Sequence, residues 1–206
     1  MLILFKELGG ITVITLIGGP MYGGKSTTLI QKMERYIYAK KSVCFIRPKK
    51  DNRGYITHGG LDDIQKILRE GDGLFEIEEF TIDAVHNFLD HYDAVFVDEF
   101  FMIKNCKLLC TEFSIRTHSD IYFAGLLSTS DNELFKETIE ILPYCDEIIK
   151  LNGVCMGLDG KGCGSQHGNY SGYFGKGTKD SNGILVGDNE YRCLCRKCYK
   201  IAIGKL

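Results

Sequence analysis

A glycine-rich segment near the N-terminus has the residue types that bind phosphate. The run Gly19-Pro20-Met21-Tyr22-Gly23-Gly24-Lys25-Ser26 fits the P-loop pattern G-x-x-x-x-G-K-[ST]. Its glycines allow successive N–H groups to point at phosphate oxygens, and Lys25 supplies a positive charge at the β- and γ-phosphates. The Ser26 hydroxyl is suited to ligate Mg²⁺. The segment therefore predicts a nucleoside triphosphate as the ligand.

Two adjacent carboxylates, Asp98 and Glu99, follow the buried-strand pattern Ala94-Val95-Phe96-Val97. In P-loop proteins an acidic residue in this place holds Mg²⁺ or its water ligands. A neighbouring carboxylate can take the proton of an attacking hydroxyl if it lies within hydrogen-bond reach. We therefore assign Asp98 to the metal and Glu99 to the general base. The alternative is an acidic pair that only ends a strand.

Cysteines gather in the last quarter of the chain. Five of the nine lie there: Cys155, Cys163, Cys193, Cys195 and Cys198. An odd total with this clustering favours a metal site in a reducing, cytoplasmic compartment over a disulfide framework. We select Cys155, Cys163, Cys195 and Cys198 as ligands of a Zn²⁺ ion. The ion would be structural, because a four-thiolate site has no open position for catalysis. Cys193 is the alternative to Cys163, and a set of unliganded thiols is the other interpretation.

Strand and helix patterns alternate around these motifs. We expect strands at 11–17, 43–46, 94–97, 121–126 and 147–151, and helices at 25–40, 61–69, 82–91 and 134–142. This alternation predicts an α/β fold, a parallel sheet with helices on both faces. The 206 residues suit one ATP-binding domain, 1–151, and a small zinc-binding lobe, 152–206. Eleven glycines between 153 and 187 predict a tethered loop without regular structure.

Composition excludes several classes of partner. A formal charge of −2 offers no basic surface for nucleic acid. There is no apolar run of about 18 residues, so we expect no membrane-spanning segment. The apolar start of the chain lacks the basic region and small-residue cleavage site of a secretory signal.

The three motifs together resemble thymidine kinases of the cellular (type II) family, over about Ile11 to Tyr199. The family's P-loop reads close to G-P-M-x-x-G-K-S-T, to which Gly19 to Thr27 is similar. Four further segments look like family motifs: Lys50-Asp51-Asn52-Arg53, Thr57-His58, Val154-Cys155-Met156, and Tyr191 with Cys195-Arg196-Lys197-Cys198-Tyr199. The last two resemble its zinc knuckles.

This resemblance implies an ATP- and Mg²⁺-dependent kinase that phosphorylates the 5′-hydroxyl of thymidine or another deoxypyrimidine nucleoside. A flexible lasso, here 164–187, would close over the nucleoside, and the chain would form a homo-oligomer, by resemblance a tetramer. Glu99, Lys25 and Arg53 would be catalytic. The ATP and Mg²⁺ site would comprise Gly19, Pro20, Met21, Tyr22, Gly23, Gly24, Lys25, Ser26, Thr27, Asp51 and Asp98, and the nucleoside site Phe101, Phe135 and Tyr191.

Three departures from the family pattern fall around the base pocket. Family members commonly read D-E-x-Q-F where this chain has Asp98-Glu99-Phe100-Phe101, without the glutamine and one residue shorter. The family's G-L-D becomes Gly125-Leu126-Leu127, and Ser128-Thr129-Ser130 replaces an expected aromatic residue. An altered pocket could accept deoxyuridine or a 5-substituted deoxyuridine. Two other classes stay open: a P-loop ATPase whose zinc lobe binds a partner, and a catalytically silent nucleotide-binding protein.

Overall fold

The computed structural model describes residues 12–49, 61–115, 119–176 and 190–204. Its larger sheet has six parallel strands in the order β3-β2-β4-β5-β1-β6. The strands are β1 (Ile14–Gly18), β2 (Val43–Pro48), β3 (Gly73–Ile77), β4 (Ala94–Asp98), β5 (Asp120–Gly125) and β6 (Glu147–Lys150). Because all run in one direction, the segments that follow β1, β4 and β5 meet at one edge of the sheet, where ligands bind in such folds.

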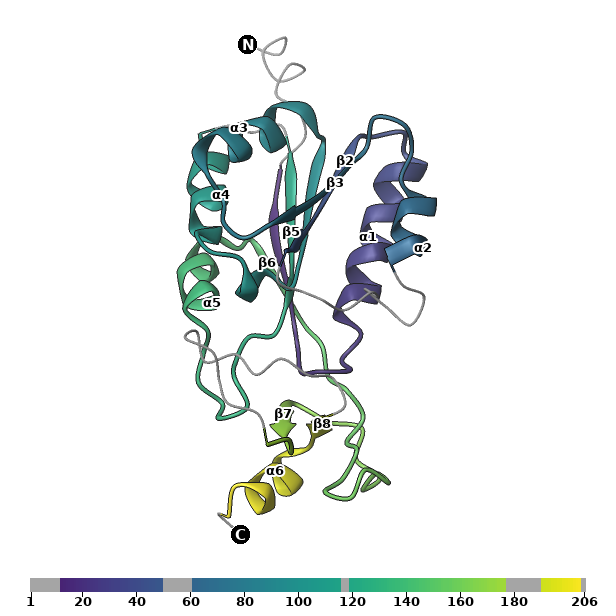
Figure 1. Cartoon of the computed structure of the whole chain (residues 1–206), viewed down its shortest axis with the longest axis vertical. Coiled ribbons are helices and arrows are strands. Elements are labelled where there is room, and N and C mark those ends of the chain that lie inside the picture. Colours follow the sequence, from purple (N-terminus) through teal and green to yellow (C-terminus); the bar gives the residue numbers. More distant parts are fainter. Residues whose placement is uncertain (1–11, 50–60, 116–118, 177–189, 205–206) are drawn as a thin grey trace, which may run out of the picture.

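Helices cover both faces of this sheet (Figure 1). One face carries α1 (Lys25–Tyr38) and α2 (Leu61–Ile67), and the other carries α3 (Ile82–His91), α4 (Cys106–Phe113) and α5 (Lys136–Ile141), with 3₁₀ turns at Phe100–Met102 and Leu142–Tyr144. The predicted α/β architecture is therefore confirmed. Sequence patterns missed β3 and α4, both short.

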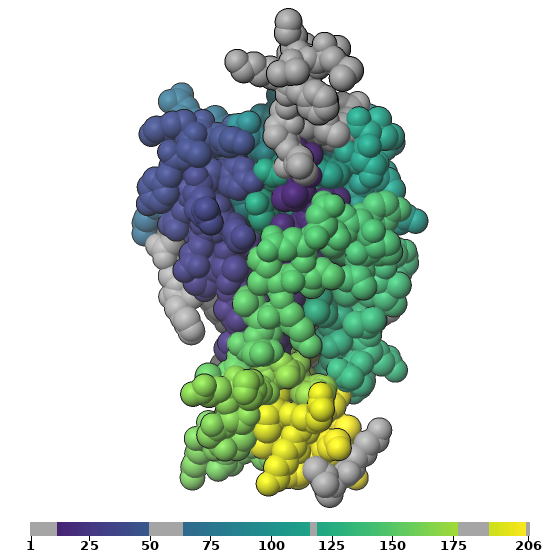
Figure 2. Space-filling model, turned by 180° about the vertical axis from the view of Figure 1, so that it is seen from behind, coloured from purple at the N-terminus to yellow at the C-terminus, as the bar shows by residue number. Residues whose placement is uncertain are grey.

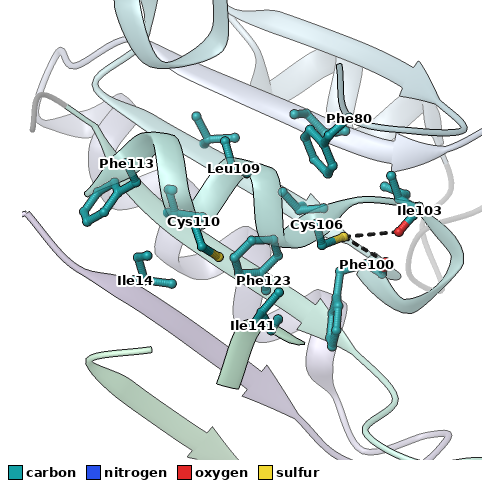
Figure 3. Close-up of a cluster of buried hydrophobic side chains, with 14 of the residues drawn as sticks. Ile14, Phe80, Phe100, Ile103, Cys106, Leu109, Cys110, Phe113, Phe123 and Ile141 are labelled. Atoms are coloured by element: carbon teal, nitrogen blue, oxygen red, sulfur yellow. Dashed lines mark hydrogen bonds between the residues drawn. The ribbon is translucent and has the colours of Figure 1, made fainter. Parts of the chain in front are cut away.

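The central strands are hydrophobic because helices bury both of their faces. Every residue of β1 and of β4 is buried. Alternate side chains enter two different clusters. Leu16, Val97 and Phe123 belong to the cluster beneath α3, α4 and α5, in which Figure 3 shows Phe123 below α4. Ile17 and Phe96 belong to the cluster beneath α1. These clusters hold the strand ends, and thus the candidate site, in fixed register.

A small lobe lies beyond the carboxyl ends of the strands (Figures 1 and 2). We call residues 12–151 the body and the described residues 153–176 and 190–204 the lobe. The lobe contains an antiparallel pair, β7 (Tyr170–Tyr173) and β8 (Tyr191–Leu194), followed by α6 (Arg196–Ala202). The expectation of a loop without regular structure is therefore wrong at β7, whose Tyr-Ser-Gly-Tyr sequence lacks the hydrophobic alternation of a strand. The remainder of the expected lasso, 177–187, lies outside the described residues.

Among the described residues, no helix has the length and hydrophobicity needed to cross a membrane.

Candidate functional site

The P-loop connects β1 to α1 through backbone conformations that few residues adopt. Tyr22 and Gly24 have φ values of 60° and 80°, in the left-handed region. The N–H of Gly23 donates to the Pro20 carbonyl at 3.1 Å, which tightens the loop. Gly24 is the N-cap of α1, so the loop opens directly onto the positive end of that helix. This is the geometry of an anion-binding site.

Two polar side chains of the predicted site meet, and a third hydrogen-bonds to the loop. The Lys25 ammonium, in a side chain that is only 6% exposed, donates to the Pro20 carbonyl oxygen at 2.9 Å. The Ser26 hydroxyl donates to Asp98 Oδ1 at 3.1 Å. A hydroxyl from α1 and a carboxylate from β4 thus converge, which is the ligand chemistry that Mg²⁺ takes in P-loop proteins. Thr27, also predicted, is exposed on the first turn of α1.

Glu99 follows β4 in a strained conformation. It is 7% exposed and has φ 47° and ψ 43°, a left-handed conformation that is unfavourable for a residue with a side chain. The turn that begins at Glu99 packs closely on β5. A Cβ atom added at Gly125 would lie 2.9 Å from the Phe100 ring and 3.0 Å from the Phe101 ring. Gly125 is therefore needed for the close approach of this turn.

The predicted nucleoside-binding aromatic residues lie in two places. Phe101 and Phe135 stack on each other in the body, with ring centroids 4.6 Å apart, and both belong to the core cluster under α4 and α5. Tyr191 lies in β8 of the lobe and is buried, with its ring centroid 5.1 Å from that of Tyr173. The first two rings thus have packing roles whether or not a base contacts them.

Four of the lobe's cysteines converge as predicted. The Sγ atoms of Cys155, Cys163, Cys195 and Cys198 all lie within 4.8 Å of one another. The Cys163–Cys195 sulfur separation is 3.8 Å. Tetrahedral coordination with Zn–S bonds of about 2.3 Å would put the sulfurs about 3.8 Å apart. The residues therefore fit a zinc ion, and Cys193 does not belong to the cluster.

Ionisation of these thiols depends on their surroundings. Backbone N–H donation from Cys198, with thiol hydrogen bonds, lowers the pKa of Cys195 to about 7. Burial raises the pKa of Cys155, and it raises the pKa of Cys198 to about 12. One thiolate thus forms readily. A divalent cation at the centre would supply the charge that lets the others deprotonate as well.

The lobe contacts the body at the P-loop itself. The Met21 N–H donates to Ser171 Oγ of β7 at 2.9 Å. The Tyr199 hydroxyl of α6 donates to the Ser130 carbonyl at 2.8 Å. Between these two contacts lies a cleft of about 370 Å³, which Gly19 and Pro20 border. Its lining, over the described part of the chain, does not include Phe101, Phe135 or Tyr191.

Sequence patterns missed two residues at this edge of the sheet. Ser171 gave no signal, because a serine in a glycine-rich stretch resembles any loop residue. Arg47 is 1% exposed at the end of β2, with its Nε 3.7 Å from Glu76 Oε1. It follows Ile46, which pairs with Val97, and so lies near the end of the strand next to the one that carries Asp98. A basic residue that ends a buried strand was the available clue. Asp51 and Arg53 lie outside the described residues.

The family model and the relatives that match this chain carry the same description. The family model described as thymidine kinase matches residues 12–199. A thymidine kinase of Pseudothermotoga lettingae is 30% identical over 197 residues, which cover 93% of this chain and 97% of the relative. Thymidine kinases of Myxoma virus and Vaccinia virus are 27% and 29% identical, over 90% of this chain and 95% and 96% of their own lengths.

Proposed function

The chain belongs to the thymidine kinase family, and from that premise we propose that it transfers the γ-phosphate of ATP to the 5′-hydroxyl of thymidine or a closely related deoxyuridine. Membership makes it a kinase that phosphorylates a nucleoside. ATP as the donor and a thymine-like base as the acceptor are parts of our proposal.

One observation carries the proposal: the hydrogen bond of 3.1 Å between Ser26 Oγ and Asp98 Oδ1, with Glu99 as the next residue along the chain. In this proposal Ser26 and Asp98 hold Mg²⁺, directly or through its water ligands. Bound Mg²⁺ would neutralise charge on the phosphate that is transferred. Because Glu99 follows Asp98 along the chain, we assign it the proton of the attacking hydroxyl.

Each remaining residue has a distinct role in the proposal. The P-loop N–H groups and Lys25 hold the triphosphate, and Lys25 and Arg53 offset charge that develops on the phosphoryl oxygens. Asp51 lies near the phosphates or substrate. Glu99 accepts the proton of the 5′-hydroxyl. Phe101, Phe135 and Tyr191 contact the nucleoside.

The lobe has a separate task in the proposal. The segment 164–187 closes over the nucleoside and excludes water, so that the phosphate goes to the nucleoside and not to water. Zinc is structural and holds both ends of this segment. We further propose a division into an ATP-binding domain, 1–151, and a zinc-binding lobe, 152–206, and a homo-oligomeric assembly.

A phosphate-transfer assay tests the proposal. Wild-type protein with γ-labelled ATP is offered a panel of deoxynucleosides, and label should appear in thymidine monophosphate or a deoxyuridine monophosphate. Glu99→Gln keeps the shape of the side chain but removes the base, so turnover should fall by about 10²–10⁴-fold while ATP binding is retained. Glu70→Gln, at an exposed glutamate after α2, is the matched control.

Three outcomes would contradict parts of the proposal. Full turnover in Glu99→Gln would remove Glu99 from the role of base. Release of phosphate from ATP without any nucleoside would favour the ATPase alternative. ATP binding with no transfer to any deoxynucleoside would favour the silent nucleotide-binding protein.

A further inference from the structure

The turn after Glu99 is short and closed by its own backbone. The Met102 N–H donates to the Glu99 carbonyl at 2.9 Å, and the Ile103 N–H donates to the Phe100 carbonyl at 3.0 Å. These bonds form the 3₁₀ turn Phe100–Met102. Glu99 is its N-cap in the left-handed conformation, without a side-chain capping bond. Such a conformation persists only where the surroundings enforce it.

A buried thiol lies directly behind this turn. Cys106, the first residue of α4, is fully buried. Its Sγ is 3.3 Å from the Phe100 carbonyl oxygen and 3.3 Å from the Ile103 carbonyl oxygen. Figure 3 shows the Cys106 sulfur directed at these two carbonyl groups. One S–H group can thus bridge both ends of the turn.

The thiol stays a donor under ordinary conditions. Burial raises the pKa of Cys106 well above that of a free cysteine. The sulfur therefore keeps its proton, so it donates to the carbonyl groups and is neither a nucleophile nor a metal ligand. Phe100 in turn packs against Gly125 of β5, so the thiol fixes the turn between α4 and the sheet.

We propose that Cys106 is a positioning residue for Glu99, holding the turn after β4 through its hydrogen bond to the Phe100 and Ile103 carbonyl oxygens. This rests on the proposed role of Glu99 as the base. The thiol connects the Phe100 carbonyl, within the turn, to the Ile103 carbonyl at its end, and Phe100 packs on Gly125, so loss of the thiol would loosen the turn that Glu99 begins. A base displaced by a fraction of an ångström loses its alignment with the attacking hydroxyl.

A matched pair of variants separates positioning from packing. Cys106→Ala removes the donor and leaves a small cavity. Cys110→Ala leaves a cavity of the same size in the same cluster, one turn further along α4. In Figure 3 the Cys110 sulfur points toward Phe123, whereas the hydrogen bonds to the carbonyl groups of the turn come from Cys106. The two variants should lose similar stability if cavity formation is the main cost.

We expect kcat to fall about tenfold in Cys106→Ala and less than about twofold in Cys110→Ala, because only the first displaces the base. The KM for ATP should not change in either. Cys106→Ser, which keeps a donor, should recover most of kcat.

Equal kcat losses in the two alanine variants, or no recovery in Cys106→Ser, would overturn the positioning role. That result is distinct from failure of the proposed function, in which the wild-type protein itself phosphorylates no nucleoside or Glu99→Gln keeps full turnover.

Discussion

The body and the lobe are stabilised by different kinds of interaction. The body buries strands on both faces in two hydrophobic clusters, and its stability comes from packed side chains. The lobe has a single small hydrophobic cluster, which consists largely of three cysteines and two stacked tyrosines. The ring centroids of these tyrosines, Tyr170 and Tyr199, lie 4.5 Å apart. So small a core does not support a fold by itself, whereas a four-thiolate metal site does.

The difference also explains how the two regions cooperate. A rigid sheet suits the groups that handle phosphate, because they must hold their positions. In our proposal the lobe, held by a metal and joined to the body by hydrogen bonds such as Met21–Ser171 and Tyr199–Ser130, acts as a cover that opens and closes. If packing stabilises the body and a metal stabilises the lobe, three kinds of change should affect the two regions differently.

Removal of zinc should have the largest effect, and only on the lobe. In Cys198→Ser, or after chelation, we expect backbone amides of 153–176 and 190–202 to lose hydrogen-exchange protection while β1, β4 and β5 keep theirs. Structural zinc in small domains contributes about 10–16 kcal/mol of apparent binding free energy. Zinc content and exchange measured on the same sample test this, with Cys193→Ser as the control that keeps the metal. If lobe amides keep their hydrogen-exchange protection without zinc, the metal is not what stabilises the lobe.

The stability of the body and the zinc content of the lobe should depend on pH in opposite directions. Burial raises the pKa of Cys106 and of Cys110 in the body. Thiols of the unfolded chain ionise at a pKa of about 8.5, so their contribution to stability is complete below that pH and is lost as pH rises. Above pH 9 each buried thiol should cost the body about 1.4 kcal/mol per pH unit.

In the lobe, thiolates that bind zinc must be protonated for the metal to leave, so zinc should be released as pH falls. Denaturant unfolding at pH 7, 9 and 10 measures the first effect, and zinc release between pH 7 and 4 measures the second. Cys110→Ala should flatten the alkaline slope; an unchanged slope would show that burial of this thiol is not its cause.

The contacts between body and lobe should give the smallest effects. Ser171→Ala removes the acceptor for the Met21 N–H, and Tyr199→Phe removes the hydroxyl that donates to Ser130 while keeping the ring stacked on Tyr170. Each should cost about 0.5–1.5 kcal/mol, measured as lost protection of lobe amides. The double variant should show nearly the sum, because the two bonds share no partner. Protection at the wild-type level in both single variants would mean that other contacts dock the lobe.

Sequence patterns predicted the body better than the lobe for physical reasons. Runs such as Val95-Phe96-Val97 are hydrophobic because both faces are buried, so pattern and structure have the same cause. The P-loop and Asp98 could be found because phosphate chemistry requires particular residue types at a particular spacing. The cluster of four cysteines could be predicted because metal coordination by thiolates is specific to cysteine, and the cluster includes Cys163 but not Cys193.

Residues that act through tertiary contacts gave no such signal. β7 pairs only with β8 and lies against the P-loop, so its residues follow that docking and not a hydrophobic period. Arg47, Ser171 and Cys106 depend on neighbours that are distant in sequence or on a turn whose conformation no local pattern predicts. The left-handed conformation of Glu99 could not be predicted either, because nothing in the sequence Asp-Glu-Phe-Phe differs from an ordinary strand end.

Gly125 has a consequence for how this protein can change. The Phe100 and Phe101 rings lie where any side chain at position 125 would begin, and even alanine would collide with them. Every amino-acid substitution at this codon therefore adds atoms where there is no room. The geometry of the turn that begins at Glu99 thus depends on an absence: the turn can lie this close to β5 only while position 125 carries no side chain.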